Sequence, residues 1–154
     1  MTGPVEVVPA AVVAAVRLAA FSALGASPGG VNASDTDPST RHTGVRLDGD
    51  LAAVATLTRE ASPRNAFRPV WRVRGMATRP AFQGRGLGGL LLAEALTHVA
   101  AHGGGLVWGN LRLAAVPFYE RHGFVVADDV FRIANGVEHR YGELTVPPAR
   151  SSST

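Results

Sequence analysis

The sequence predicts an α+β protein with a central mixed, largely antiparallel sheet and flanking helices. Two expected strands at residues 44–47 and 51–58 lie on either side of the dipeptide Asp48-Gly49, which is typical of a tight β-hairpin turn. Beyond residue 70, strand-like and helix-like segments alternate and end in two further strands. The chain has 154 residues and 46% hydrophobic content, which fits one domain with a core of ordinary size.

Each expected element follows from a local pattern. Pro9 suits the first turn of a helix over 10–24, which a strand at 5–8 precedes. Glycine after a helix indicates its end, so Gly103 to Gly105 close a helix that runs to about residue 101, and Gly123 closes one over 114–121. The remaining expectations are loops at 25–43 and 61–68 and strands at 70–76, 106–108, 124–127 and 138–146. We expect one domain over residues 1–146 and a disordered tail over 147–154.

Composition argues against several classes of protein. All 15 basic residues are arginines and lie scattered along the chain, whereas a nucleic-acid-binding surface needs clustered charge. The longest apolar stretches, 10–20 and 90–101, are interrupted by charged or polar residues and are shorter than the ~20 residues of a membrane span. There is no cysteine, which excludes disulfides, thiolate metal sites and cysteine nucleophiles. The N-terminus lacks a basic segment, so we expect no signal peptide and a cytoplasmic protein.

A glycine-rich stretch, AFQGRGLGG at residues 81–89, precedes the helix that ends near 101. Gly84, Gly86 and Gly89 match the dinucleotide pattern G-x-G-x-x-G, but hairpin strands precede the loop and no carboxylate follows about 20 residues on. A P-loop is excluded because the chain has no lysine. A turn that serves only the fold explains one or two glycines. Four glycines favour exposed N–H groups at a helix start, which bind phosphate.

A second motif, AAVPFYERHGF at residues 114–124, gives this loop a context. Together with Gln83-Gly-Arg-Gly86-Leu-Gly88, it resembles the GCN5-related N-acetyltransferase (GNAT) superfamily, whose phosphate loop is Arg/Gln-x-x-Gly-x-Gly/Ala. The family's preceding strand often ends like Met76-Ala-Thr78-Arg-Pro80. Its later motif is matched by Arg112, Ala115, Phe118, Tyr119, Arg121, Gly123 and Phe124, while Leu111 replaces a usual alanine. The resemblance covers roughly residues 44–146.

The resemblance implies a three-layer fold with a splayed parallel strand pair, here 70–76 and 106–108, and acetyl-CoA as cosubstrate without a metal. A backbone N–H near Met76 would polarise the thioester carbonyl. Tyr119 would be the general acid for the CoA thiolate; alternatively it is a core residue on a short helix. The implied cofactor-binding residues are Met76, Ala77, Thr78, Gln83, Gly84, Arg85, Gly86, Leu87, Gly88, Gly89, Asn110, Arg112 and Phe118.

A general base is not evident, because the strand VWRVRGMAT carries no acid where relatives often have one. Glu60, Glu138 and His139 are candidates, each alternatively a solvated residue, and water is a further relay. His98 and His102 are spaced i, i+4 without a third ligand, which favours surface histidines over zinc.

The leading hypothesis is direct acetyl transfer to a primary amine. The alternative is a non-catalytic acyl-CoA sensor with the same fold. The acceptor pocket is expected in segments 25–43, 61–68 and 128–139, without identifying the amine. We expect neither a nucleic-acid nor a membrane partner; dimers are common among relatives, so a homodimer is compatible with the resemblance.

Overall fold

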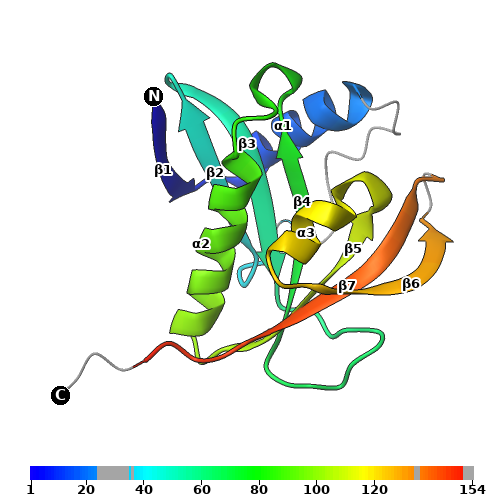
Figure 1. Ribbon diagram of the computed structural model, residues 1–154. Helices are drawn as coiled ribbons and strands as arrows, with labels where there is room; N and C mark the ends of the chain where they lie inside the picture. Colours follow the sequence, from blue (N-terminus) through cyan, green and yellow to red (C-terminus); the bar gives the residue numbers. More distant parts are fainter. Residues whose placement is uncertain (24–34, 36, 134–135, 151–154) are drawn as a thin grey trace. The chain divides into compact units, whose positions relative to one another are not determined.

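The computed structural model describes residues 1–23, 35, 37–133 and 136–150. Seven strands form one sheet in the order β1-β2-β3-β4-β5-β7-β6 (Figure 1). The chain divides into two compact units, the first comprising Met1–Arg59 and Val73–Ala95 and the second Glu60–Arg72 and Leu96–Thr154. The elements are β1 (Thr2–Val7), α1 (Ala10–Ala23), β2 (Arg41–Leu47), β3 (Asp50–Thr58), β4 (Val70–Thr78), η2 (Pro80–Phe82), α2 (Leu87–Ala101), β5 (Gly105–Arg112), η3 (Leu113–Ala115), α3 (Val116–Arg121), β6 (Val125–Arg132) and β7 (Glu138–Val146).

The first unit begins with an antiparallel meander of β1, β2 and β3. Leu47 pairs with Asp50 across a two-residue turn. Asp48 and Gly49 both have positive φ, 52° and 89°, as this kind of hairpin turn requires. The hairpin that the Asp-Gly dipeptide predicted is therefore confirmed.

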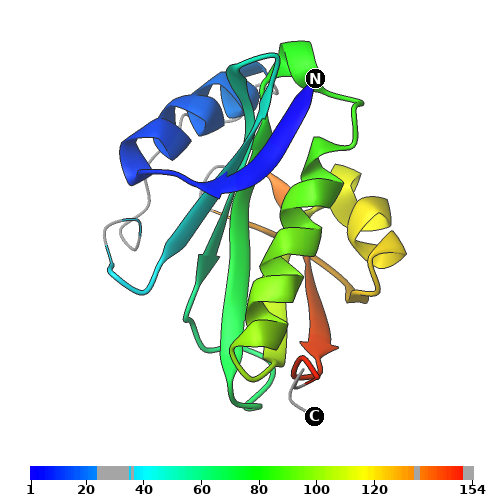
Figure 2. The ribbon, with the colours of Figure 1, turned by 90° about the vertical axis from the view of Figure 1, so that its left-hand side faces the viewer.

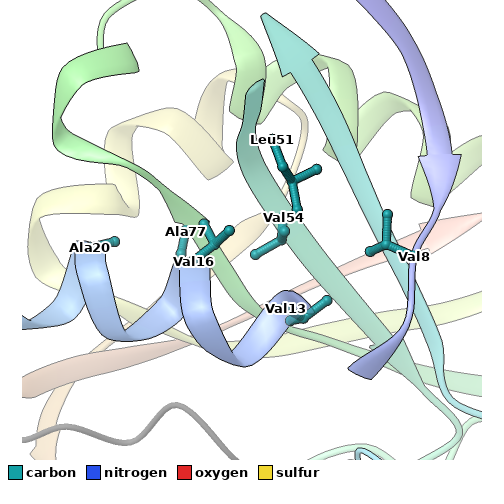
Figure 3. Close-up of a cluster of buried hydrophobic side chains, with 7 residues drawn as sticks. All are labelled: Val8, Val13, Val16, Ala20, Leu51, Val54 and Ala77. Atoms are coloured by element: carbon teal, nitrogen blue, oxygen red, sulfur yellow. The ribbon is translucent and has the colours of Figure 1, made fainter. Parts of the chain in front are cut away.

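Two helices cover opposite sides of the first unit's strands, as Figure 2 shows. On the α1 side, Val13 and Val16 pack with Val54 and Ala77 in one buried cluster, whose members Figure 3 labels. On the α2 side, Leu87 and Leu91 pack in a second cluster with Val45, Leu47, Ala52, Ala53 and Ala55. β3 is buried on both faces, which explains why it reads as a nearly continuous apolar run.

In the second unit, β5 has a parallel neighbour on one side and an antiparallel neighbour on the other. The first residues of β4 pair in parallel with β5, from Val70 with Leu106 to Arg72 with Trp108. On its other side β5 pairs antiparallel with β7, and β7 with β6. These pairings confirm the predicted mixed, largely antiparallel sheet with a parallel pair.

Several elements differ in extent from the sequence expectation. The strand expected at 106–108 continues to Arg112, and the strand expected at 124–127 runs over Val125–Arg132. The helix expected at 114–121 is split into η3 and α3, because Pro117 stands in the first turn of α3. β2 begins at Arg41, inside the loop expected at 25–43; residues 25–34 and 36 of that loop lie outside the described residues, as does residue 24 of the helix expected at 10–24.

The single domain over 1–146 and the disordered tail remain predictions. Residues 151–154 lie outside the described residues, and before them the Ala149 N–H donates to the Ala100 carbonyl over 2.8 Å. Within the described ranges, the helices are too short or too polar to cross a membrane.

The glycines after α2 provide a stability test. Gly105 has φ 146°, and a Cβ there would lie 2.5 Å from the Pro69 carbonyl oxygen. Gly103 has φ 98°, but its Cβ would meet nothing within 4 Å. We expect Gly103→Ala to cost about 1–2 kcal/mol of unfolding free energy, from backbone strain alone, and Gly105→Ala to cost more because backbone must move. Urea unfolding measures the free energy of unfolding of both variants. Equal losses in the two variants would contradict a clash between a Cβ at position 105 and the Pro69 carbonyl oxygen.

Candidate functional site

The first part of the loop between β4 and α2 is tied to the strands. The Arg79 N–H donates to the Ala52 carbonyl over 2.8 Å, and Arg79 Nε donates to the Leu51 carbonyl over 2.9 Å. The side-chain Nε2 of Gln83 donates to the Thr78 carbonyl over 3.3 Å. These contacts hold the chain from Thr78 to Gln83 against β3 and β4, so the glycines that follow start from a fixed position.

Two of the four glycines meet a backbone requirement, and two lie in the first turn of α2. Gly84 and Gly86 have φ of 79° and 76°, and a Cβ at either would meet nothing within 4 Å. Their side of the loop is thus open, and glycine is needed for conformation. The first helical hydrogen bond runs from the Leu90 N–H to the Gly86 carbonyl, so the N–H groups at 87–89 precede any intrahelical acceptor.

The start of α2 is anchored from its apolar side. Leu87 is 2% exposed and Leu91 is fully buried, whereas Gln83 to Gly86 are exposed. The helix therefore directs its N-terminal N–H groups to an accessible surface while its Leu side chains fix its position. Positive potential at this end of the helix favours an anion.

Arg85 adds a full positive charge to this loop. The pKa of the Asp48 carboxyl is lowered mainly by its hydrogen bond from the N-terminal ammonium group, and the charge of Arg85 contributes to the same lowering. The exposed loop thus combines backbone N–H groups with a guanidinium, the donor set that a phosphate group needs.

Tyr119 lies in α3, where its side chain is 6% exposed. Its ring makes edge-to-face contacts with Phe118 at 5.1 Å and Phe124 at 5.2 Å between centroids. Burial raises the pKa of Tyr119 to about 12, and the nearby charge of Arg112 acts in the opposite direction. The phenol therefore stays protonated at any physiological pH and can donate a hydrogen bond.

Asn110 and Arg112 lie two positions apart in β5, so their side chains project from the same face of the sheet. In the register, Asn110 lies opposite Tyr141 and Arg112 opposite His139. Both are half-buried, and burial lowers the pKa of the Arg112 guanidinium. The second unit thus brings Arg112, Phe118 and Tyr119 into one neighbourhood, while the first unit holds Met76 to Thr78 and Gln83 to Gly89.

The three candidate bases have different surroundings. The Glu60 carboxylate lies 3.6 Å from Arg72, and its carbonyl accepts a 2.9 Å hydrogen bond from Trp108 Nε1. Glu138 is exposed, with Arg132 at 4.0 Å. His139 is buried, and its Nδ1 lies 2.8 Å from the Val137 carbonyl. The expectation of a solvated residue is therefore wrong for His139, because Phe131 stacks on its ring.

His98 and His102 stack on each other and contact Trp71 edge-on. Among the described residues there is no group of three or more side chains suited to hold a metal ion. The two histidines belong to an aromatic cluster at the end of α2.

A buried polar cluster in the first unit was missed by sequence reasoning. Arg17 of α1 is fully buried, and it donates to the Asp35 carboxylate over 2.8 Å and to Thr56. His42 contacts Thr56 Oγ1 and the Asp35 carbonyl, each at 2.9 Å, and Arg74 lies 3.8 Å from the Asp35 carboxylate. The only sequence signal was Arg17 itself, the charge that interrupts an apolar stretch.

Comparisons with known proteins agree with this architecture. A model of the Acetyltransferase (GNAT) family matches residues 18–124, more than half of the chain, and the chain belongs to this family. It is 29% identical over 92 residues to YitI, an uncharacterized N-acetyltransferase of Bacillus subtilis (strain 168). That match spans 60% of this chain and 62% of YitI.

Solved structures show the same fold. An acyl-CoA N-acyltransferase from Pseudomonas aeruginosa superposes with a TM-score of 0.73 at 19% identity, covering 90% of this chain and 97% of that one. The acetyltransferase yncA from Salmonella typhimurium, solved with its cofactor acetyl-CoA, superposes with a TM-score of 0.68 at 14% identity, covering 99% of this chain and 98% of that one.

The two tyrosines of the chain provide a test of this electrostatic environment. Burial raises the pKa of both Tyr119 and Tyr141 to about 12, against about 10 for a free phenol. We expect little phenolate absorbance near pH ~10.5 in the folded protein and extensive ionisation in guanidinium. Because the folded pKa values are raised, their contribution to stability is complete below about pH 10 and is lost as pH rises towards about 12.

A Tyr141→Phe variant isolates Tyr119 in the same absorbance titration. Ionisation of the remaining tyrosine near pH ~10 in the folded variant would contradict the burial of its hydroxyl.

Proposed function

We propose that this protein is an acetyl-CoA-dependent N-acetyltransferase that transfers the acetyl group directly to a primary amine in the cytoplasm. The observation that carries the proposal is the open, glycine-rich start of α2, where N–H groups without intrahelical acceptors lie beside Arg85. Family membership and a structural neighbour solved with acetyl-CoA support the choice of donor.

In this proposal the diphosphate of CoA binds the N–H groups from Gly84 to Gly89. Gly88 and Gly89 lack side chains that would stand between the phosphates and the backbone. The backbone of Met76, Ala77 and Thr78 pairs with the pantetheine arm, and an N–H of this segment polarises the thioester carbonyl. Gln83 holds the loop in place, since its side-chain amide donates a hydrogen bond to the Thr78 carbonyl.

The amine nitrogen attacks the thioester carbon, the C–S bond breaks, and the proton lost by nitrogen is finally carried by the CoA sulfur. Tyr119 donates a hydrogen bond to that sulfur as negative charge develops on it. The raised pKa of Tyr119 keeps its proton available across the assayable pH range, and the Arg112 charge moderates the effect of burial.

The alternative is a sensor that binds acyl-CoA without turning it over. The observation that favours it is the composition of β4, which carries Arg72 and Arg74 and has no carboxylate to accept the amine proton. Release of CoA thiol separates the two functions. A suitable panel of acceptors contains polyamines, amino acids, peptides with free N-termini and lysine-containing peptides.

Gly88→Glu tests the phosphate site. Gly88 lies in the first turn of α2, where a glutamate is favourable for the helix, whereas Gly86 has positive φ and would be strained by any side chain. We expect Gly88→Glu to weaken acetyl-CoA binding about 100-fold or more in calorimetry through like-charge repulsion, with unchanged thermal stability. Ala93→Glu adds the same charge at an exposed position of α2 and should bind normally. Normal binding by Gly88→Glu would refute the loop assignment.

Tyr119→Phe tests the proton donor. Loss of a positioned group that donates a hydrogen bond to the sulfur and relays a proton costs about 10²-fold or more in kcat, and we expect that loss with unchanged acetyl-CoA affinity. Tyr141→Phe is the matched control, because it removes the phenolic hydroxyl of the other buried tyrosine, where that hydroxyl contacts Ser62 and Glu143, and it should retain kcat. Activity of the wild type should show no falling limb from Tyr119 below about pH 11, given its pKa of about 12. Unchanged kcat in Tyr119→Phe would end this assignment.

A further inference from the structure

The side chains of β4 do not alternate regularly near the end of the strand. In a regular strand, successive residues point to opposite faces. Arg74 reaches Asp35, which is bonded to Arg17 of α1, and the next residue, Gly75, also faces Arg17. Met76 then packs in the cluster on the α2 side, and Ala77 in the cluster on the α1 side. The alternation is therefore interrupted by one residue at Gly75, where φ is 62°.

The guanidinium of Arg17 lies directly against this interruption. A Cβ at Gly75 would be 2.6 Å from Arg17 Nε and 2.7 Å from one terminal nitrogen. Arg17 is fully buried and is held by Asp35 and Thr56, which come from different parts of the first unit. Because the guanidinium is planar and held by two partners, it presents a fixed surface to the backbone of β4.

We infer that Arg17 is a positioning residue for acyl transfer. Its guanidinium holds the backbone of β4 in the left-handed turn at Gly75 and thereby fixes the direction of the N–H and C=O groups at Met76 to Thr78. This inference rests on the proposed function, in which that segment binds the pantetheine arm and polarises the thioester. Arg17 acts through the strand and touches no substrate.

The inference predicts a separation between catalysis and cofactor binding. Arg17→Met keeps most of the side-chain length but removes the planar, charged head. We expect kcat for thiol release with the acceptor panel to fall about 10–100-fold, because small misplacement of reacting groups costs this much. Calorimetric affinity for CoA should fall much less, by about threefold at most, because CoA carries no thioester to be polarised and only its pantetheine arm contacts the altered segment. The phosphate loop is anchored separately, through Arg79 and Gln83.

Val13→Ala is the control for simple destabilisation. Val13 is fully buried, lies one helical turn before Arg17 on α1, and packs in the cluster with Ala77. We expect it to lower the melting temperature while retaining kcat. Equal loss of kcat in Val13→Ala, unchanged kcat in Arg17→Met, or a parallel loss of CoA affinity would each overturn the inference.

A second pair of variants tests the same contact from the strand, even if Arg17→Met does not fold. Gly75→Ala forces a methyl group against the guanidinium and should lower kcat while retaining CoA affinity. Gly44→Ala is its match, since its Cβ would lie 2.7 Å from Leu51 Cδ1, away from Arg17 and without positive φ. Equal kcat in the two glycine variants would overturn the inference. Absence of wild-type turnover with intact acetyl-CoA binding would instead refute the proposed function, and this inference with it.

Discussion

Burying the guanidinium of Arg17 removes a full charge from water, and much of the first unit is arranged around the groups that compensate for it. Such a transfer costs several kcal/mol unless hydrogen bonds and an opposite charge replace the water. Asp35 and Thr56 provide both, and His42 in turn orients Thr56 and the Asp35 backbone. The cluster leaves no space for a side chain at position 75, and the glycine that stands there has a φ of 62°. The directions of Met76 and Ala77 follow from that conformation.

At the start of α2, an unfavourable local helix propensity is likewise balanced by the burial of apolar side chains against other elements. Gly88 and Gly89 each weaken the helix by about 1 kcal/mol relative to alanine. Burial of a leucine side chain contributes about 1.5–3 kcal/mol, and Leu87 and Leu91 are both buried. The apolar side of the helix thus compensates for the glycines, which are only partly buried. An accessible row of N–H groups is stable here because the opposite face of the helix is well packed.

Sequence patterns predicted elements whose signals are local. The Asp48-Gly49 hairpin, the strand at Glu138–Val146 and the helix ending at Ala101 follow from turn chemistry, apolar residues and glycine. The extents of β5 and β6 could not be predicted, because the residues added beyond Trp108 are strands only through pairing with β7. The Arg17 cluster could not be predicted either, because its contacts are distant in sequence: Asp35 and Thr56 lie 18 and 39 positions from Arg17. An isolated glycine in a strand was an available signal for the interruption at Gly75.

The buried position of Tyr119 also bears on the missing base. Its pKa of about 12 exceeds that of a thiol, about 8.5, so full transfer of the phenolic proton to the thiolate would cost about 5 kcal/mol. In the proposed reaction, the proton that the sulfur finally carries must therefore come from the attacking nitrogen, whose acidity rises sharply once it has bonded to the acyl carbon. Tyr119 then supplies a hydrogen bond and a path for that proton, and is not consumed as an acid. A reaction balanced in this way does not require a carboxylate on β4. Arg72 and Arg74 can occupy that strand in ion pairs with Glu60 and Asp35. What it does require is an amine that arrives without its extra proton, so the rate should be governed by the pKa of the acceptor and not by that of Tyr119.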